Sequence, residues 1–166
     1  MSGKLARCIN TRDFQKRARR ALPSPVLGYL EGGADDEYTL ARNISAYQDY
    51  ELIPRFLTDV SEVDTSTTVL GTTVDLPVLL SPTGMSRLFH PEAELAVARA
   101  AAKSGTMYCL STVATESIES VAEVCSGPKM FQVYVLGDAS LNREFIQRCK
   151  AADYTALCLT VDVPAG

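Results

Sequence analysis

Residues 76–85, Leu-Pro-Val-Leu-Leu-Ser-Pro-Thr-Gly-Met, are the stretch that decides the fold of this chain. Its run Val78–Leu80 is short and wholly apolar, which is typical of a strand buried on both faces of a parallel sheet. The run stops at Ser81-Pro82-Thr83-Gly84, where proline fixes φ and glycine lets the backbone come close to another group. A helical segment follows from about Pro91, so this loop joins a strand to a helix. Ligands bind at that edge of βα folds.

Two more strand–loop–helix units and a fourth strand follow this one. We predict strands at 78–80, 107–110, 129–133 and 156–161, and helices at 91–103, 117–125 and 140–151. The strand onsets at 78, 107, 129 and 156 lie 22 to 29 residues apart, which is the spacing of βα units. The chain is therefore an α/β protein with four parallel strands and three complete crossovers.

The segment before the first strand is different in character. The sequence predicts helices at 12–22 and 24–31, a further helix from about Asp35 to Tyr47, and a small hairpin at 67–70 and 73–75. We expect one domain over 1–166. Within it, 1–66 form a helical leader, and 67–166 form the hairpin and the first four strands.

Composition excludes several classes of protein. With 166 residues, 46% hydrophobic and a net charge of −4, the chain is no general nucleic-acid binder. No apolar run reaches the roughly 20 residues of a membrane span, and the N-terminus has no apolar signal core, so we expect a cytoplasmic protein. The five cysteines are scattered without CxxC spacing, which suggests neither a zinc site nor a disulfide framework.

Four parallel strands fit either an open doubly wound sheet or half of a closed barrel. In a doubly wound fold we expect a G-x-G-x-x-G turn after the first strand, and Ser-Pro-Thr-Gly-Met does not match that motif. The sequence stops at Asp162-Val163-Pro164-Ala165-Gly166, directly after a strand. Half a barrel leaves strand edges unpaired, so we expect this chain to be a fragment.

Polar side chains follow each predicted strand, where a βα fold binds its ligand. Any one is weak evidence, but four pairs in succession indicate a polar ligand. They are Ser81 and Thr83, Ser111 and Thr112, Gln132 and Tyr134, and Thr160 and Asp162. His90 is the only histidine, and its place near a helix start favours a capping or packing role over that of a general base. The residues alone identify no base.

Six short motifs together carry a resemblance that covers nearly the whole chain. The chain resembles the N-terminal half of the FMN-dependent α-hydroxy acid dehydrogenase/oxidase family, which includes glycolate oxidase, lactate dehydrogenases and oxidases, and mandelate dehydrogenase. The motifs are Tyr29-Leu30-Glu31-Gly32-Gly33-Ala34, Ser81-Pro82-Thr83-Gly84-Met85, His90-Pro91-Glu92, Leu110-Ser111-Thr112, Phe131-Gln132-Val133-Tyr134 and Leu159-Thr160-Val161-Asp162.

The resemblance implies a (β/α)8 TIM barrel, of which this chain supplies the helical leader and about the first four strands. It also implies FMN at the mouth of the barrel and oxidation of an L-2-hydroxy acid, that is, an (S)-2-hydroxy acid, to a 2-oxo acid. Tyr134 matches the catalytic tyrosine near the substrate hydroxyl, and Tyr29 matches the tyrosine that binds the substrate carboxylate. The matching flavin contacts are Ser81, Pro82, Thr83, Gly84, Ser111, Gln132 and Thr160.

The resemblance also implies what this chain lacks. The family's flavin lysine, histidine base, substrate arginine and phosphate-binding loop all follow the fourth strand, so this chain carries half of an active site. The expected partners are the small 2-hydroxy acid, the C-terminal half of the same barrel as a continuation or bound second fragment, and further copies in a homo-oligomer such as a tetramer. The alternative is a non-catalytic half-barrel that acts as a flavin-binding or assembly module. Attachment to the periphery of a membrane is a second option for its location.

Two small residues bear on the size of the substrate. Gly84 stands where the oxidase branch of the family often has alanine, and Val113 stands where glycolate oxidase has tryptophan. We expect both replacements to leave room beside the flavin for substrates larger than glycolate.

Overall fold

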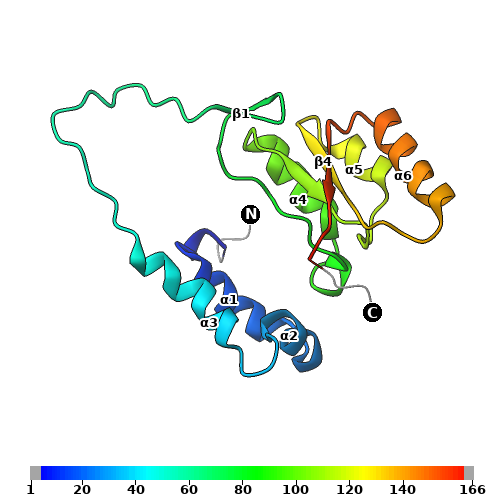
Figure 1. Ribbon diagram of the computed structural model, residues 1–166. Helices are drawn as coiled ribbons and strands as arrows, with labels where there is room; N and C mark the ends of the chain where they lie inside the picture. Colours follow the sequence, from blue (N-terminus) through cyan, green and yellow to red (C-terminus); the bar gives the residue numbers. More distant parts are fainter. Residues whose placement is uncertain (1–4, 163–166) are drawn as a thin grey trace. The chain divides into compact units, whose positions relative to one another are not determined.

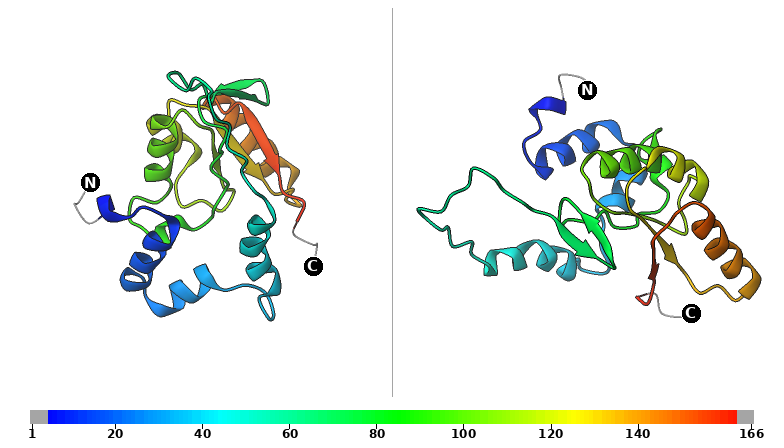
Figure 2. Two further views of the ribbon diagram at one scale, coloured as in Figure 1. Left: turned by 90° about the vertical axis from the view of Figure 1, so that its left-hand side faces the viewer. Right: turned by 90° about the horizontal axis from the view of Figure 1, so that it is seen from above.

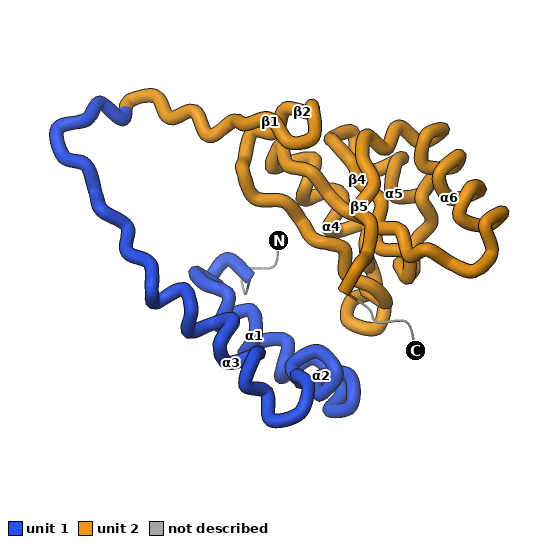
Figure 3. The backbone as a smooth tube through the Cα atoms, viewed as in Figure 1, with its two compact units in different colours: residues 1–60 blue, residues 61–166 orange. Residues whose placement is uncertain are grey.

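The computed structural model describes residues 5–162 of the chain (Figure 1). The chain divides into two compact units, Met1–Val60 and Ser61–Gly166, which Figure 3 shows in different colours. We describe each unit by itself. The predicted boundary at 66 and the assignment of 1–166 to one domain stay predictions.

The first unit is helical. Its elements are η1 (Leu5–Arg7), α1 (Thr11–Ala21), α2 (Ser24–Glu31), α3 (Tyr38–Ser45) and η2 (Ala46–Asp49). Asn10 caps α1 by accepting the Asp13 amide at 3.0 Å. Helices α1 and α2 are joined by the Glu31 carboxylate, which accepts hydrogen bonds from Arg19 Nε at 2.8 Å and Gln15 Nε2 at 2.9 Å.

The third helix begins later than the sequence predicts. Asp35 and Glu37 have φ angles of 49° and 58°, so the acidic run forms a left-handed turn rather than the first turn of a helix. The Glu37 carboxylate accepts the Gly33 amide at 3.1 Å within this turn. Helix α3 therefore starts at Tyr38, and the predicted end at Tyr47 falls inside η2.

The second unit opens with the predicted hairpin. Strands β1 (Thr67–Val69) and β2 (Thr72–Val74) pair antiparallel, with Val69 opposite Thr72. The turn residues are Leu70 and Gly71, and both have positive φ, at 49° and 79°. This is the backbone of a two-residue turn that matches the twist of a hairpin, and it places the turn one residue earlier than predicted.

Three parallel strands, β3 (Tyr108–Leu110), β4 (Lys129–Val133) and β5 (Ala156–Leu159), form a sheet in that order. The crossovers are α5 (Ile118–Val124) and α6 (Ala139–Ala151), and α4 (Ala93–Lys103) precedes β3 after a short η3 (Ser86–Leu88). Ser117 caps α5 by accepting the Ser120 amide at 3.0 Å, and Asp138 caps α6. These elements agree with the predicted ones to within two residues at each boundary.

The predicted first strand, Val78–Leu80, is wrong as a strand buried on both faces. Leu80 makes only an isolated parallel bridge to Tyr108. Its N–H donates to the Met107 carbonyl, and its carbonyl accepts the Cys109 amide. Val78 is 57% exposed and Leu79 is 38% exposed. The physical reason is that, within the described residues, only Leu80 of this segment pairs with the neighbouring strand, so Val78 and Leu79 are not held inside a sheet that is covered on both faces.

The core lies between the sheet and its three helices (Figures 1 and 2). Side chains alternate along each strand, so Leu110, Phe131 and Val133 face the helices. The Phe131 ring packs on Phe145 of α6, with the centroids 5.8 Å apart, and on Tyr154, with the centroids 6.4 Å apart. The opposite face of the same strands therefore carries the alternate residues.

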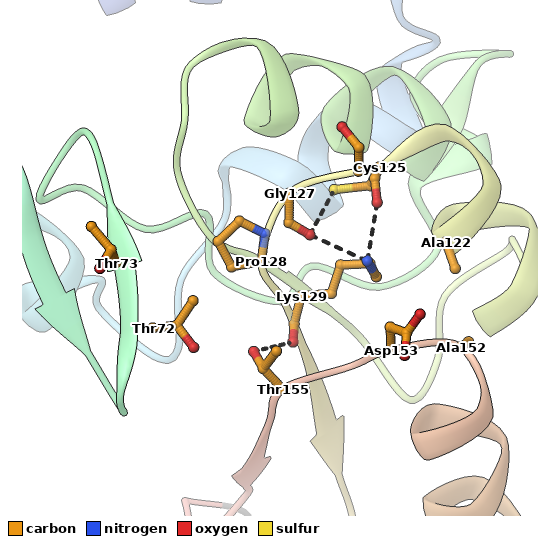
Figure 4. A pocket seen from close by; sticks show the side chains of 11 residues that line it. Thr72, Thr73, Ala122, Cys125, Gly127, Pro128, Lys129, Ala152, Asp153 and Thr155 are labelled. Atoms are coloured by element: carbon orange, nitrogen blue, oxygen red, sulfur yellow. Dashed lines mark hydrogen bonds between the residues drawn. The ribbon is translucent and has the colours of Figure 1, made fainter.

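A cavity of about 510 Å³ lies at the amino ends of β4 and β5. Figure 4 shows Lys129 reaching toward the end of α5, where its ammonium donates to the carbonyls of Cys125 at 3.0 Å and Gly127 at 3.2 Å. A cation there stabilises the carboxyl end of the helix. This cavity is at the opposite edge of the sheet from the predicted ligand-binding loops.

Candidate functional site

A row of hydrogen-bonded polar side chains crosses the carboxyl ends of β3, β4 and β5. Ser111 Oγ donates to Gln132 Oε1 at 2.9 Å, and Gln132 Nε2 donates to Thr160 Oγ1 at 2.8 Å. Ser111 and Gln132 are 3% and 8% exposed, so the row is largely removed from solvent. The register explains the row. Leu110 pairs with Phe131, so Ser111 follows opposite Gln132. Gln132 pairs with Cys158, so Thr160 lies two residues beyond its partner and on the same face. The structure thus brings together three of the predicted site residues.

The loop after Leu80 lies beside this row. Ser81 and Thr83 are exposed, while Pro82 and Gly84 are half-buried. The Met85 amide donates to the Val113 carbonyl at 3.0 Å, which joins this loop to the loop after β3. All four predicted residues of the loop, 81–84, therefore lie at the same edge as Ser111.

Gly84 is in close contact with Val113. A Cβ added at Gly84 would lie 2.4 Å from Val113 Cγ2 and 3.3 Å from the Val113 carbonyl oxygen. The Val113 side chain therefore fills the space that an alanine methyl would need. The expectation that Gly84 leaves free volume is wrong, because its neighbour occupies that volume.

The two predicted tyrosines belong to different units. Tyr134 follows β4 directly and is half-buried, and its phenol makes no hydrogen bond with any described residue. Tyr29 lies in α2 of the first unit and is 65% exposed. That Tyr29 joins the site stays a prediction.

His90 has the capping role that we expect from its position. Its Nδ1 accepts the Glu92 amide at 3.2 Å, immediately before α4. The imidazole thus satisfies one of the amides left free at a helix start.

Sequence reasoning missed Glu94 and Thr115. Glu94 is fully buried in the first turn of α4, and its carboxylate accepts the Thr115 amide at 3.0 Å and the Thr115 hydroxyl at 2.7 Å. The sequence carries a weak signal for this, since Glu94 lies among alanines and leucine on an alanine-rich helix. A charge on such a face is normally paired when it is buried.

The free donors of the row fit the edge of a flavin ring. Gln132 Nε2 uses one of its two hydrogens on Thr160, and the Thr160 hydroxyl proton has no acceptor among the described residues. The ring edge of a flavin carries carbonyl oxygens and ring nitrogens, which accept such hydrogens. Gly84 and Pro82 supply a surface close to the row without long side chains. The residues present therefore suit a flat heteroaromatic group.

The profile of the FMN-dependent dehydrogenase family matches residues 18–166. The chain belongs to this family. The match confirms the predicted family and the predicted cofactor, FMN, as the one that the family uses.

Individual relatives agree with the family match. The chain is 42% identical over 156 residues to the peroxisomal (S)-2-hydroxy-acid oxidase GLO4 of Oryza sativa subsp. indica, covering 94% of this chain and 43% of the relative. It is 39% identical over 155 residues to glycolate oxidase of Spinacia oleracea, covering 93% and 42%. The chain thus spans less than half the length of the curated relatives that it matches.

Solved structures confirm the fold. A mandelate oxidase structure superposes with a TM-score of 0.87 at 38% identity, covering 93% of this chain and 46% of that one. A soluble mutant of the membrane-associated (S)-mandelate dehydrogenase from Pseudomonas putida gives a TM-score of 0.87 at 38% identity, covering 94% and 44%. The chain has the fold of the N-terminal part of a (β/α)8 barrel in this family. Within residues 5–162, no helix has the length and hydrophobicity needed to cross a membrane.

The polar row gives a first prediction. In the full-length protein, Gln132→Leu removes the bridge between Ser111 and Thr160, so we expect the Kd for FMN to rise about tenfold, near the value of one or two net hydrogen bonds. Equilibrium titration of the apoprotein with FMN measures it. Gln147→Leu on the exposed side of α6 is the matched control and should change the Kd less than twofold. An unchanged Kd for Gln132→Leu would remove the row from the flavin site.

Proposed function

We propose that this chain is the N-terminal half of an FMN-dependent oxidoreductase that converts an (S)-2-hydroxy acid to a 2-oxo acid. The observation that carries the proposal is the row from Ser111 through Gln132 to Thr160 at the carboxyl edge of the sheet, in a chain of this family. A row of oriented donors at the mouth of a barrel suits a cofactor that must be held in one orientation.

The residues divide into two roles toward FMN. We propose that Pro82, Thr83 and Gly84 lie against the ring, with Ser81 at the base of their loop. Ser111, Gln132 and Thr160 bind its polar edge. When bound, FMN accepts the hydrogen from C2 of the substrate with its two electrons. The chain's own contribution is to fix the reacting carbon against the ring.

The two tyrosines are proposed to act on the substrate. We propose that Tyr134 binds the substrate hydroxyl, whose proton leaves as the C2 carbonyl forms. Its phenol has no partner among the described residues, so it is free to make that bond. Tyr29 is proposed to bind the substrate carboxylate.

The remainder of the site is proposed to come from the C-terminal half of the barrel, as a continuation or a bound second fragment. That half would supply the base that takes the hydroxyl proton, the arginine for the carboxylate and the phosphate-binding loop. We propose a homo-oligomer, such as a tetramer, in the cytoplasm or at the periphery of a membrane, with no nucleic-acid partner.

The experiment that tests this function uses the full-length protein. We expect purified protein to contain FMN, identified by mass after release, and to form a 2-oxo acid from an (S)-2-hydroxy acid, detected as its hydrazone. FMN without product would favour the flavin-binding module, and protein that neither contains nor binds FMN would overturn the proposal.

Substrate size gives a second prediction. Val113 is half exposed beside the proposed ring, and it is smaller than the tryptophan that the resemblance places there. Each buried methylene of a larger substrate gains roughly 0.8 kcal/mol at most, which is several-fold in kcat/KM. We therefore expect lactate, 2-hydroxyoctanoate or mandelate to exceed glycolate in kcat/KM. Glycolate as the best of these four substrates would contradict this expectation.

A further inference from the structure

A buried carboxylate, that of Glu94, joins the two loops that carry most of the proposed flavin contacts. Glu94 is 0% exposed and lies one residue into α4. Its Oε1 accepts the Thr115 amide at 3.0 Å and the Ser86 amide at 3.4 Å, while Oε2 accepts the Thr115 hydroxyl at 2.7 Å. One side chain thus binds backbone in two different loops.

Ser86 and Thr115 each follow a segment of the proposed site. Ser86 comes directly after the loop 81–85, and Thr115 comes two residues after Val113 in the loop that begins at Ser111. The same two loops are tied further by the Met85 amide on the Val113 carbonyl and by the Arg87 amide on the Thr115 hydroxyl. Glu94 is the buried centre of this junction.

The carboxylate has no cationic partner within residues 5–162, since none of the ion pairs there involves Glu94. Burial alone raises the pKa of Glu94, but the hydrogen bonds from the Thr115 amide and hydroxyl and from Ser86 outweigh it, so the pKa lies below its usual value. The group is therefore an anion at neutral pH that can only accept hydrogen bonds. Such charge-assisted bonds are stronger than neutral ones, and the amino end of α4 also favours the negative charge.

We propose that Glu94 is a positioning residue for the flavin site. By binding both loops it sets the separation between Pro82-Thr83-Gly84 on one side and Ser111 with Val113 on the other. A ring held between these loops then meets them at one fixed distance. This inference rests on the proposed function, because it concerns the loops to which that function assigns FMN.

The test compares Glu94→Gln with Glu92→Gln in the full-length protein. Both variants remove one negative charge near the start of α4, but Glu92 is exposed and pairs only with Arg99. Hydrogen exchange of the apoprotein reads the junction directly and needs no flavin. We expect Glu94→Gln to speed exchange at least tenfold in 85–88 and 113–116 but not in α6, and Glu92→Gln to leave both loops unchanged.

Flavin binding supplies the second readout. We expect Glu94→Gln to raise the Kd for FMN at least tenfold and to change the visible circular dichroism of the flavin at saturating FMN, which a general loss of stability would not do. Glu92→Gln should change the Kd less than twofold. If Glu94→Gln does not fold, Thr115→Val removes one of the same hydrogen bonds. It should speed exchange in the same loops and raise the Kd for FMN, each about threefold. Thr115→Ser keeps the hydroxyl and should restore both values.

The outcomes test two claims separately: that Glu94 holds the two loops together, and that this junction positions the flavin. Unchanged exchange in both loops of Glu94→Gln would overturn the junction itself. Faster exchange with an unchanged Kd and unchanged flavin spectrum would overturn the positioning role and leave Glu94 a structural residue. A wild-type protein that binds no FMN would instead refute the proposed function, while the exchange data would still decide whether the junction exists.

Discussion

Replacing Tyr134 with phenylalanine is expected to slow flavin reduction by the hydroxy acid roughly 30- to 1,000-fold while FMN stays bound. The reason is that we propose the phenol to stabilise charge on the substrate oxygen, and loss of one such donor is worth about 2–4 kcal/mol in the transition state. The Tyr134 phenol has no hydrogen bond to any described residue, so its removal leaves no buried partner unsatisfied. Anaerobic stopped-flow reduction at saturating substrate measures the effect.

Tyr108→Phe is the matched control for this prediction. Tyr108 is 1% exposed, and its phenol oxygen is buried without a hydrogen-bond partner in the structure, on the face of β3 that packs against the helices. Removing that hydroxyl should leave the reduction rate unchanged and should not destabilise the protein. If Tyr134→Phe reduced the flavin as fast as wild type, Tyr134 would have no catalytic role.

The second large effect is expected at Gly84. An alanine Cβ there would lie 2.4 Å from Val113 Cγ2 and 3.3 Å from the Val113 carbonyl oxygen, so Gly84→Ala must displace the Val113 side chain and crowds the backbone of the loop that carries Ser111. Overpacking of this kind costs about 1–3 kcal/mol, and we expect kcat/KM to fall roughly 5- to 150-fold. Steady-state kinetics of the full-length variant measure it.

A double variant separates steric displacement from other causes. Val113→Ala removes the methyl groups that an alanine at position 84 would strike, so Gly84→Ala with Val113→Ala should recover most of the loss. Gly137→Ala is the control, because a Cβ at Gly137 meets nothing within 4 Å, and it should leave kcat/KM unchanged. A double variant as impaired as the single one would contradict the steric account.

Local signals explain most of what the sequence predicts correctly. Asn10 and Ser117 are side chains whose oxygen can accept an amide two or three residues ahead, so the starts of α1 and α5 depend on few residues. The strand Lys129–Val133 is observed with the predicted bounds, since it is paired on both sides by β3 and β5. The order of strands and helices follows from the same periodicity.

The errors arise where specific contacts, some distant in the chain and some local, override the propensity of a segment. Val78–Leu80 has the composition of a central strand, but within residues 5–162 only Leu80 pairs, which leaves a single bridge. Asp35 and Glu37 favour a helix start by charge, yet their positive φ values place them in a turn. Propensity is a weak prior that such contacts override.

In the candidate site, too, some features follow from the local sequence pattern and others depend on contacts in the folded chain. The positions of Ser111, Gln132 and Thr160 at strand ends follow from the βα pattern, and the structure brings them into one hydrogen-bonded row. The burial of Glu94 and the contact between Gly84 and Val113 depend on how two loops meet, which no short stretch of sequence encodes. These contacts need the folded chain.

The most direct measurement is an anaerobic titration of the full-length, FMN-loaded protein with an (S)-2-hydroxy acid, followed at the visible flavin absorption. We expect the absorption to bleach with one equivalent of the (S)-enantiomer per flavin, because one C2 hydrogen with its electron pair reduces one FMN, and the (R)-enantiomer to leave it unchanged. A flavin that stays oxidised with excess glycolate and with excess (S)-2-hydroxy acids of every size up to mandelate would contradict this function.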